Sequence, residues 1–285
     1  MRKTLFSGIA ACLLATAATA AEQSPSVIWT VGQADRSASE FALAPDRFRD
    51  FLANDFGYED KYFLVGHSVP AADFPYVLPG PADTWGGTWP TSGWRTHQVN
   101  ILFGLKEIPS DGTCTLVVDL LDYAKNFLPL VKVSVNTQDA KFQLDAPGLC
   151  VADQRKPNQM EKIVDTLSIT GNLAKATPRR LEIPIRPGVL KAGGNEVTIT
   201  VLEGSWILFD RVSLEGPAGT NVEQPQQLFI RNIEAAPYEL ADGKRRVQPL
   251  LVDLEWLEGA PALSVELDDK EILNQRIETG RYQLE

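Results

Sequence analysis

Histidine and cysteine are scarce in this 285-residue chain, which holds two histidines and three cysteines. A structural zinc site takes about four such ligands, so a Cys/His metal cluster is not expected. Basic residues are also few, 27 against 37 acidic ones, which gives a net charge of −10. An acidic surface repels nucleic-acid phosphates and anionic lipid headgroups. Nucleic acids and membrane surfaces are therefore poor partner candidates.

Long apolar runs and the short motifs of common enzymes are missing as well. After the first 21 residues no run of about 18 or more apolar residues is present that could span a bilayer. We find no Gly-x-Ser-x-Gly elbow, P-loop, His-Glu-x-x-His motif or dinucleotide fingerprint. No cofactor and no metal ion are expected from these patterns.

The first 21 residues are typical of a cleaved secretory signal. Arg2 and Lys3 precede an apolar stretch over residues 5–18, and small residues follow at 18–21. The protein is therefore expected to be exported to the periplasm or the extracellular space, with a charge of 25 − 37 = −12 after cleavage. A lipoprotein signal ending at Cys12 is the alternative.

Export leaves Cys114 and Cys150 in an oxidising compartment. An even pair of cysteines there is more often a disulfide than a metal site. The sequence therefore predicts a Cys114–Cys150 disulfide, which would stabilise the fold by about 3–4 kcal/mol. Two free thiols titrated in the exported protein would contradict it.

Short β-branched and apolar runs separated by Gly, Pro, Asn and Asp recur along the chain, which is typical of an all-β fold. Strands are predicted at residues 27–31, 62–65, 98–105, 114–122, 130–135, 141–144, 180–185, 196–202 and 206–215. One surface helix is predicted near residues 156–167. We expect residues 22–217 to form one antiparallel jelly-roll β-sandwich whose last strand pairs with its first.

A break rich in glycine and proline at residues 215–220 separates a second unit. Four more strands are predicted beyond it, at residues 228–235, 246–256, 262–267 and 271–276. Residues 223–285 should thus form a small immunoglobulin-like β domain. That length is short for a complete sandwich of about 100 residues, so the chain is either truncated, with a catalytic domain missing downstream, or closes this domain early.

The most unusual composition lies in residues 66–97, where three tryptophans fall within ten positions among glycines and prolines. Aromatic rings on such a loop can stack on the apolar faces of sugars, while polar neighbours bond to the hydroxyls. The candidate sugar-binding residues are Trp85, Trp89, Trp94, Arg95, His97 and Asp83. The alternative is that the tryptophans plug the end of the sandwich and pin a long loop.

Catalytic residues are not assigned. His67 or His97 beside a carboxylate could act as a general base, although a lone histidine at a strand entrance is more often structural. Asp35 and Glu40 are the carboxylates to inspect for a glycosidase pair about 5–10 Å apart. Turn capping at the surface is the alternative role for both.

Three stretches of the chain resemble one known domain. Residues 29–41 (WTVGQADRSASEF) look like the opening of the carbohydrate-binding-like jelly-roll domain of rhamnogalacturonan lyases and related bacterial glycan-degrading enzymes. Residues 62–66 (YFLVG) with 83–85 (DTW) resemble its second segment, and residues 190–200 with 204–210 resemble its closing strands. The resemblance covers about residues 27–216.

In those lyases the eliminating residues belong to a separate upstream sandwich, so the resemblance implies sugar binding more than catalysis. The leading hypothesis is a non-catalytic carbohydrate-binding module, the accessory part of an exported polysaccharide-degrading enzyme, with a polysaccharide or oligosaccharide as partner. A polysaccharide lyase acting on pectin-like glycans is the alternative. A structural spacer sandwich without ligand is the third hypothesis.

Overall fold

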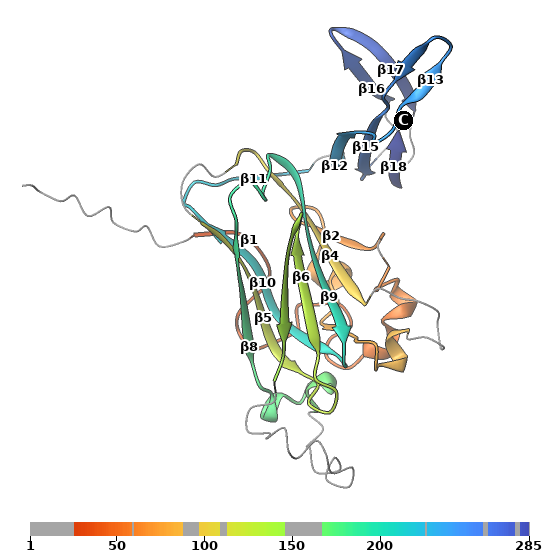
Figure 1. Cartoon of the computed structure of the whole chain (residues 1–285). Helices are drawn as coiled ribbons and strands as arrows, with labels where there is room; N and C mark the ends of the chain where they lie inside the picture. The colour runs from red at the N-terminus through yellow and green to blue at the C-terminus, as the bar shows by residue number, and fades with distance from the viewer. Residues whose placement is uncertain are drawn as a thin grey trace, which may run out of the picture.

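The computed structural model describes residues 26–58, 60–87, 97–108, 113–145, 167–225, 227–258, 262–276 and 280–284. These residues form an all-β protein in which two sheets pack face to face and a smaller β module sits at one end (Figure 1). The strands of the sandwich are β1 Ser26–Gly32, β2 Tyr62–Leu64, β3 Val77–Leu78, β4 Gln98–Leu105, β5 Cys114–Tyr123, β6 Leu130–Val135, β7 Gln138–Gln143, β8 Arg179–Ile185, β9 Gly193–Glu203, β10 Ile207–Gly216 and β11 Val222–Glu223.

The strand order is that of a jelly roll. One sheet has the order β1-β10-β5-β8, with β3 also paired to β10, and the other has the order β11-β4-β9-β6-β7, with β2 also paired to β4. Counting only β1 and β4 to β10 as strands one to eight, the two orders become 1-8-3-6 and 2-7-4-5, two interleaved Greek keys. All neighbours among these eight strands are antiparallel. The predicted all-β sandwich is confirmed.

The core lies between the two sheets because apolar residues alternate with polar ones along the strands. In β9, Val197, Ile199 and Val201 are buried in the central cluster, while Glu196 and Thr198 point to the outer face and are half-buried. The same alternation runs through β6 and β8, whereas β4 is buried along nearly its whole length. One face of each sheet is thereby left for solvent or a ligand.

The first and last strands of the sandwich are neighbours, as the sequence predicts. In the antiparallel pair β1–β10, Ser26 lies opposite Gly216 and Gly32 lies opposite Arg211. The short strand β2 differs from the expected antiparallel pattern, because it runs parallel to β4. It sits at the edge of the six-stranded sheet, where it pairs with a single partner.

Within the described residues, helical structure is confined to short turns in the connections. They are α1 Pro70–Asp73 and the 3-10 turns η1 Phe48–Asp50, η2 Leu52–Asn54, η3 Thr84–Gly86, η6 Leu167–Thr170 and η7 Leu173–Lys175. The helix predicted near residues 156–167 falls almost entirely outside the described residues. No helix in the described ranges is long and apolar enough to cross a membrane.

As far as its residues are described, the C-terminal module consists of one three-stranded sheet and two hairpins. Its strands are β12 Leu228–Ala235, β13 Leu240–Asp242, β14 Arg245–Val247, β15 Leu250–Trp256, β16 Ala262–Leu267, β17 Lys270–Arg276 and β18 Gly280–Leu284. The sheet has the order β12-β15-β18, and the hairpins are β13–β14 and β16–β17. The prediction of a single strand over residues 246–256 is wrong, because the structure has two strands there, β14 and β15. Pro249, which has no amide to donate, separates β14 from β15.

Cys114 is buried at the start of β5, and burial raises the pKa of its thiol. Cys150 lies outside the described residues. The disulfide between them stays a prediction.

Candidate functional site

The base of the tryptophan-rich loop is built around Asp83, whose side chain is buried at the sandwich end. Its carboxylate accepts hydrogen bonds from the Gly80 amide at 2.9 Å, from the Ser205 hydroxyl at 2.5 Å and from the Trp85 side chain. Burial raises the pKa of Asp83, and the hydrogen bonds lower it by less. Asp83 therefore ties residues 80–85 to the turn between β9 and β10.

Trp85 and His97 also face inward. The half-buried indole of Trp85 packs edge-on against Phe48 and Phe51, with ring centroids 5.0 and 6.2 Å apart. His97 is 5% exposed, and its carbonyl accepts the Val201 amide at 3.1 Å. Trp89, Trp94 and Arg95 lie outside the described residues. The loop as a sugar site stays a prediction, while its three described members are placed as parts of the scaffold.

The outer face of the six-stranded sheet carries two rows of polar side chains. The strand registers place Asn100, Thr198, Ser134 and Asp139 in one row across β4, β9, β6 and β7. The next row along the strands is Gln98, Thr200, Lys132 and Lys141. We call these eight side chains the polar face. Asn100 and Thr200 are buried, at 2% and 9% exposure, and the other six side chains are half-buried or exposed. Polar groups that project from rigid strands and reach the surface offer donors and acceptors to a ligand.

Hydrogen bonds between neighbours hold the side chains of the polar face in place. Ser134 donates to Asp139 at 2.7 Å, and Thr198 donates to the Asn100 side-chain oxygen at 3.4 Å. Gln98 donates to the same oxygen at 3.1 Å. Donors and acceptors arranged in this way lose little conformational entropy when a ligand binds.

The outer face of the other sheet has different chemistry, because its charged residues pair with one another. Arg211 contacts Asp119 at 2.9 Å, and Arg180 contacts Glu182 at 2.7 Å and Asp119 at 3.5 Å. Glu215 lies within 3.6 Å of both arginines. Each of these five side chains has an oppositely charged partner within the network. The polar face is therefore the better candidate for ligand recognition.

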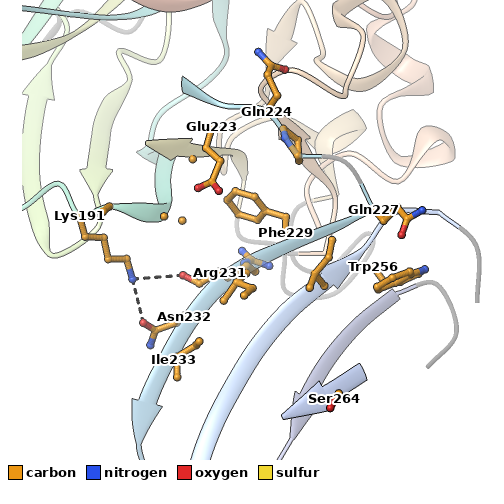
Figure 2. A pocket seen from close by; sticks show the side chains of 17 residues that line it. Lys191, Glu223, Gln224, Gln227, Phe229, Arg231, Asn232, Ile233, Trp256 and Ser264 are labelled. Carbon is orange, nitrogen blue, oxygen red and sulfur yellow. Dashed lines mark hydrogen bonds between the residues drawn. The ribbon is translucent and has the colours of Figure 1, made fainter. Parts of the chain in front are cut away.

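One end of the polar face is roofed by the C-terminal module. A space of about 370 Å³ lies between Ser134, Glu196 and Thr198 on the sandwich and Phe229 and Arg231 on β12. A larger space of about 1030 Å³ continues along β12 (Figure 2) and shares Lys191, Phe229, Arg231 and Asn232 with the first. We call the two spaces the module cleft. Its volume suits a ligand of several sugar rings.

Arg231 of β12 links the module to the sandwich through one ion pair and is held in place by a second, buried pair within the module. Arg231 contacts Glu255 of its own sheet at 2.8 Å and Glu196 of β9 at 2.9 Å, and the Arg231 and Glu255 side chains are only 7% and 4% exposed. Tyr62 of β2 hydrogen-bonds to Glu255, and its pKa is raised to about 12, chiefly by burial.

Apolar and backbone contacts complete the attachment. Phe229 packs with Leu64 and Leu102 in a small buried cluster. A side chain at Gly194 would collide with the Ile230 carbonyl, so β12 lies directly against β9. The walls of the module cleft are thus held at a fixed separation.

The acidic pair singled out in the sequence has local partners. Asp35 accepts the Ser37 amide and Glu40 accepts the Gln33 amide, both at 2.9 Å. Both carboxylates therefore cap turns, as the alternative role supposed. Among the described residues no group of three or more His, Cys, Asp or Glu is placed to hold a metal ion.

The polar face was not among the sequence candidates. A signal was present, because the alternation Glu-Val-Thr-Ile-Thr-Val over residues 196–201 indicates one outward polar row. The partners of that row come from residues about 60 and 100 positions away, and only the strand registers bring them together.

A jelly-roll sandwich with a polar, partly roofed sheet face has the architecture of a ligand-binding β-sandwich module. The family model for the CBM-like domain III of polysaccharide lyase family 4 matches residues 27–214, well over half of the chain. The chain belongs to this family. A search of curated proteins found no match.

Proposed function

We propose that this protein binds carbohydrate without cleaving it, as an accessory part of an exported polysaccharide-degrading enzyme. Family membership supports a carbohydrate-binding role for residues 27–214. The signal-like first 21 residues support export.

The observation that carries the proposal is the polar face beside the module cleft. Sugar hydroxyls need donors and acceptors in close alternation, and Thr198, Ser134 and Asp139 supply hydroxyl and carboxylate groups on adjacent strands. Asn100, which is only 2% exposed, supports the row by accepting a hydrogen bond from Thr198. The indole of Trp85 is engaged with Phe48 and Phe51. We therefore place the principal contacts on the polar face, and stacking by Trp89 and Trp94 remains a second proposal for an additional contact.

The test is a binding assay with plant and bacterial polysaccharides, using Thr198→Val as the site variant. Loss of one neutral hydrogen bond, worth about 0.5–1.5 kcal/mol, should weaken binding by about 2- to 12-fold. Thr115→Val is the matched control, since Thr115 is a half-buried threonine on β5 of the opposite sheet. Its affinity should equal that of the parent.

Three outcomes would contradict parts of the proposal. A parent that binds no polysaccharide in the panel would refute the function. Unchanged binding by Thr198→Val, together with lost binding by Trp94→Ala, would move the site to the tryptophan-rich loop. Unsaturated sugar ends, detected by their ultraviolet absorbance after incubation with pectin-like glycans, would show that the protein is a lyase.

A further inference from the structure

We propose that the module cleft selects uncharged glycans and excludes polyanionic ones such as polyuronates. This inference rests on the proposed carbohydrate-binding function and adds the class of glycan to it.

Carboxylates outnumber cations on the walls of the module cleft. The lining cations are Lys191 and Arg231. The lining carboxylates are Glu196, Glu223, Glu234 and Asp253. The sum over the lining is 2 − 4 = −2, and the buried Glu255 behind Arg231 adds a further negative charge.

The two cations of the cleft are already engaged. Arg231 lies between the carboxylates of Glu196 and Glu255, so its charge is neutralised within the protein. The Lys191 amine donates to the Asn232 side-chain oxygen at 3.0 Å and to the Arg231 carbonyl at 3.4 Å (Figure 2). An incoming sugar carboxylate would have to displace these bonds to gain a cationic partner.

Two carboxylates remain open to a ligand. Glu223 and Glu234 are exposed, and neither forms an ion pair with any other described residue. Figure 2 shows the Glu223 carboxylate beside Phe229, on the sandwich side of the cleft. A sugar carboxylate bound here would lie within about a Debye length, ~8 Å at physiological salt, of like charge.

The part of the polar face outside the module cleft does not offset the excess of negative charge in the cleft. It carries Lys132, Lys141 and Asp139, and Lys132 contacts Asp139 at 3.5 Å. Only Lys141 remains as an excess positive charge, on the edge strand β7, in a protein with a net charge of −10. An uncharged glycan bonds to the amides and hydroxyls of the face without this electrostatic cost.

The experiment compares acidic polysaccharides with their own carboxyl-reduced forms, for example polygalacturonate with the neutral galactan that reduction produces. Each pair has the same backbone and linkage and differs only at C6, where reduction replaces the charged carboxylate by an uncharged hydroxymethyl group. We expect the neutral form to bind at least about 10-fold more tightly at about 0.01 M salt, and the difference to shrink at about 1 M salt, where the Debye length is only ~3 Å. Equal or tighter binding of the acidic forms would overturn the inference while leaving the carbohydrate-binding function intact.

A second measurement assigns the discrimination to the cleft. The double variant Glu223→Gln and Glu234→Gln should raise the affinity for the acidic form several-fold relative to that for the neutral form, so that the ratio of neutral to acidic affinity falls. Glu182→Gln, which removes an exposed carboxylate from β8 of the opposite sheet, is the control and should change neither. If Glu182→Gln raised the affinity for the acidic form as much as the double variant does, only the overall charge of the protein would matter. A panel in which neither neutral nor acidic glycans bind would refute the proposed function itself.

Discussion

At the scale of single residues, Asp210 shows how a carboxylate is retained in a costly position. It is 8% exposed on β10, and its oxygen accepts the Arg36 amide at 3.0 Å, which anchors the turn after β1. Burial is the main cause that raises its pKa from 3.8 to about 6, and the neighbouring Asp35 and Asp119 raise it further. Asp210 in its charged form therefore lowers the stability of the fold, although its carboxylate anchors the turn after β1.

The sign of the pH effect follows from proton linkage. Between pH 3.8 and about 6 the folded state holds more protons on Asp210 than the unfolded state, so the unfolding free energy falls as the pH rises through this window. Asp210→Asn keeps an acceptor for Arg36 and removes the charge. We expect the variant to be about 1–2 kcal/mol more stable at pH 7, after allowance for solvent screening, and to have a shallower slope over this window.

Urea unfolding of the parent and of Asp210→Asn at about pH 4 and pH 7 measures both quantities. Asp83, whose pKa is also raised, leaves a residual slope of the same sign in the variant. Parallel pH profiles for the two proteins would show that Asp210 does not contribute.

At the scale of elements, η3 is the short turn that carries Trp85 into the core. Replacing Trp85 by Ala removes its edge contacts with Phe48 and Phe51 and its bond to Asp83. We expect a loss of about 2–4 kcal/mol of stability, less than for a fully buried tryptophan. Phe127→Ala is the control, because Phe127 is 56% exposed, and it should cost little. Thermal unfolding of both variants measures the two losses of stability.

A fully stable Trp85→Ala protein that has lost glycan binding would contradict this prediction and would make Trp85 a stacking platform.

Strand existence could be predicted well from local pattern. Four strands, β4, β6, β12 and β16, have the bounds expected from their apolar runs and flanking turns. The start of β7 was missed because Gln138 and Asp139 are polar, and the bend at Pro249 was missed because the apolar pattern continues across it. Pattern alone reports how much of a strand is buried, and it does not report the hydrogen-bond partners that define the ends of the strand.

The candidate site was far less predictable. Composition drew attention to the tryptophan-rich loop, whereas Asn100, Thr198 and Ser134 are ordinary polar residues in three separate strands. Their proximity depends on sheet order and register, and a shift of one residue would turn each side chain to the core. No local signal carries that information.

At the scale of the whole molecule, the attachment of the module to the sandwich depends on Arg231. Arg231→Met would remove the Arg231–Glu196 contact that crosses to β9. It would also leave the buried carboxylate of Glu255, beside the sandwich residue Tyr62, without its cation, and breaking such a pair costs about 3–5 kcal/mol. We expect the module to separate from β9 and proteases to cut near residues 224–227 at a much higher rate.

The control for this prediction makes the same substitution at an exposed pair. Arg246 contacts Glu239 at 3.2 Å on the module surface, where both side chains are largely exposed. Arg246→Met should be cut as slowly as the parent, since exposed pairs contribute about 0–1 kcal/mol. Equal cleavage of the two variants would show that apolar packing alone holds the module.

The pairing of Ser26 with Gly216 has a consequence for the way the sandwich sits in a polypeptide. The chain enters and leaves the domain side by side, at one end of the same pair of strands. A domain with adjacent ends can be inserted into a loop of a longer chain, because the flanking segments do not have to span its length. Because Ser26 and Gly216 are neighbours, a segment joined before Ser26 would start next to a segment joined after Gly216.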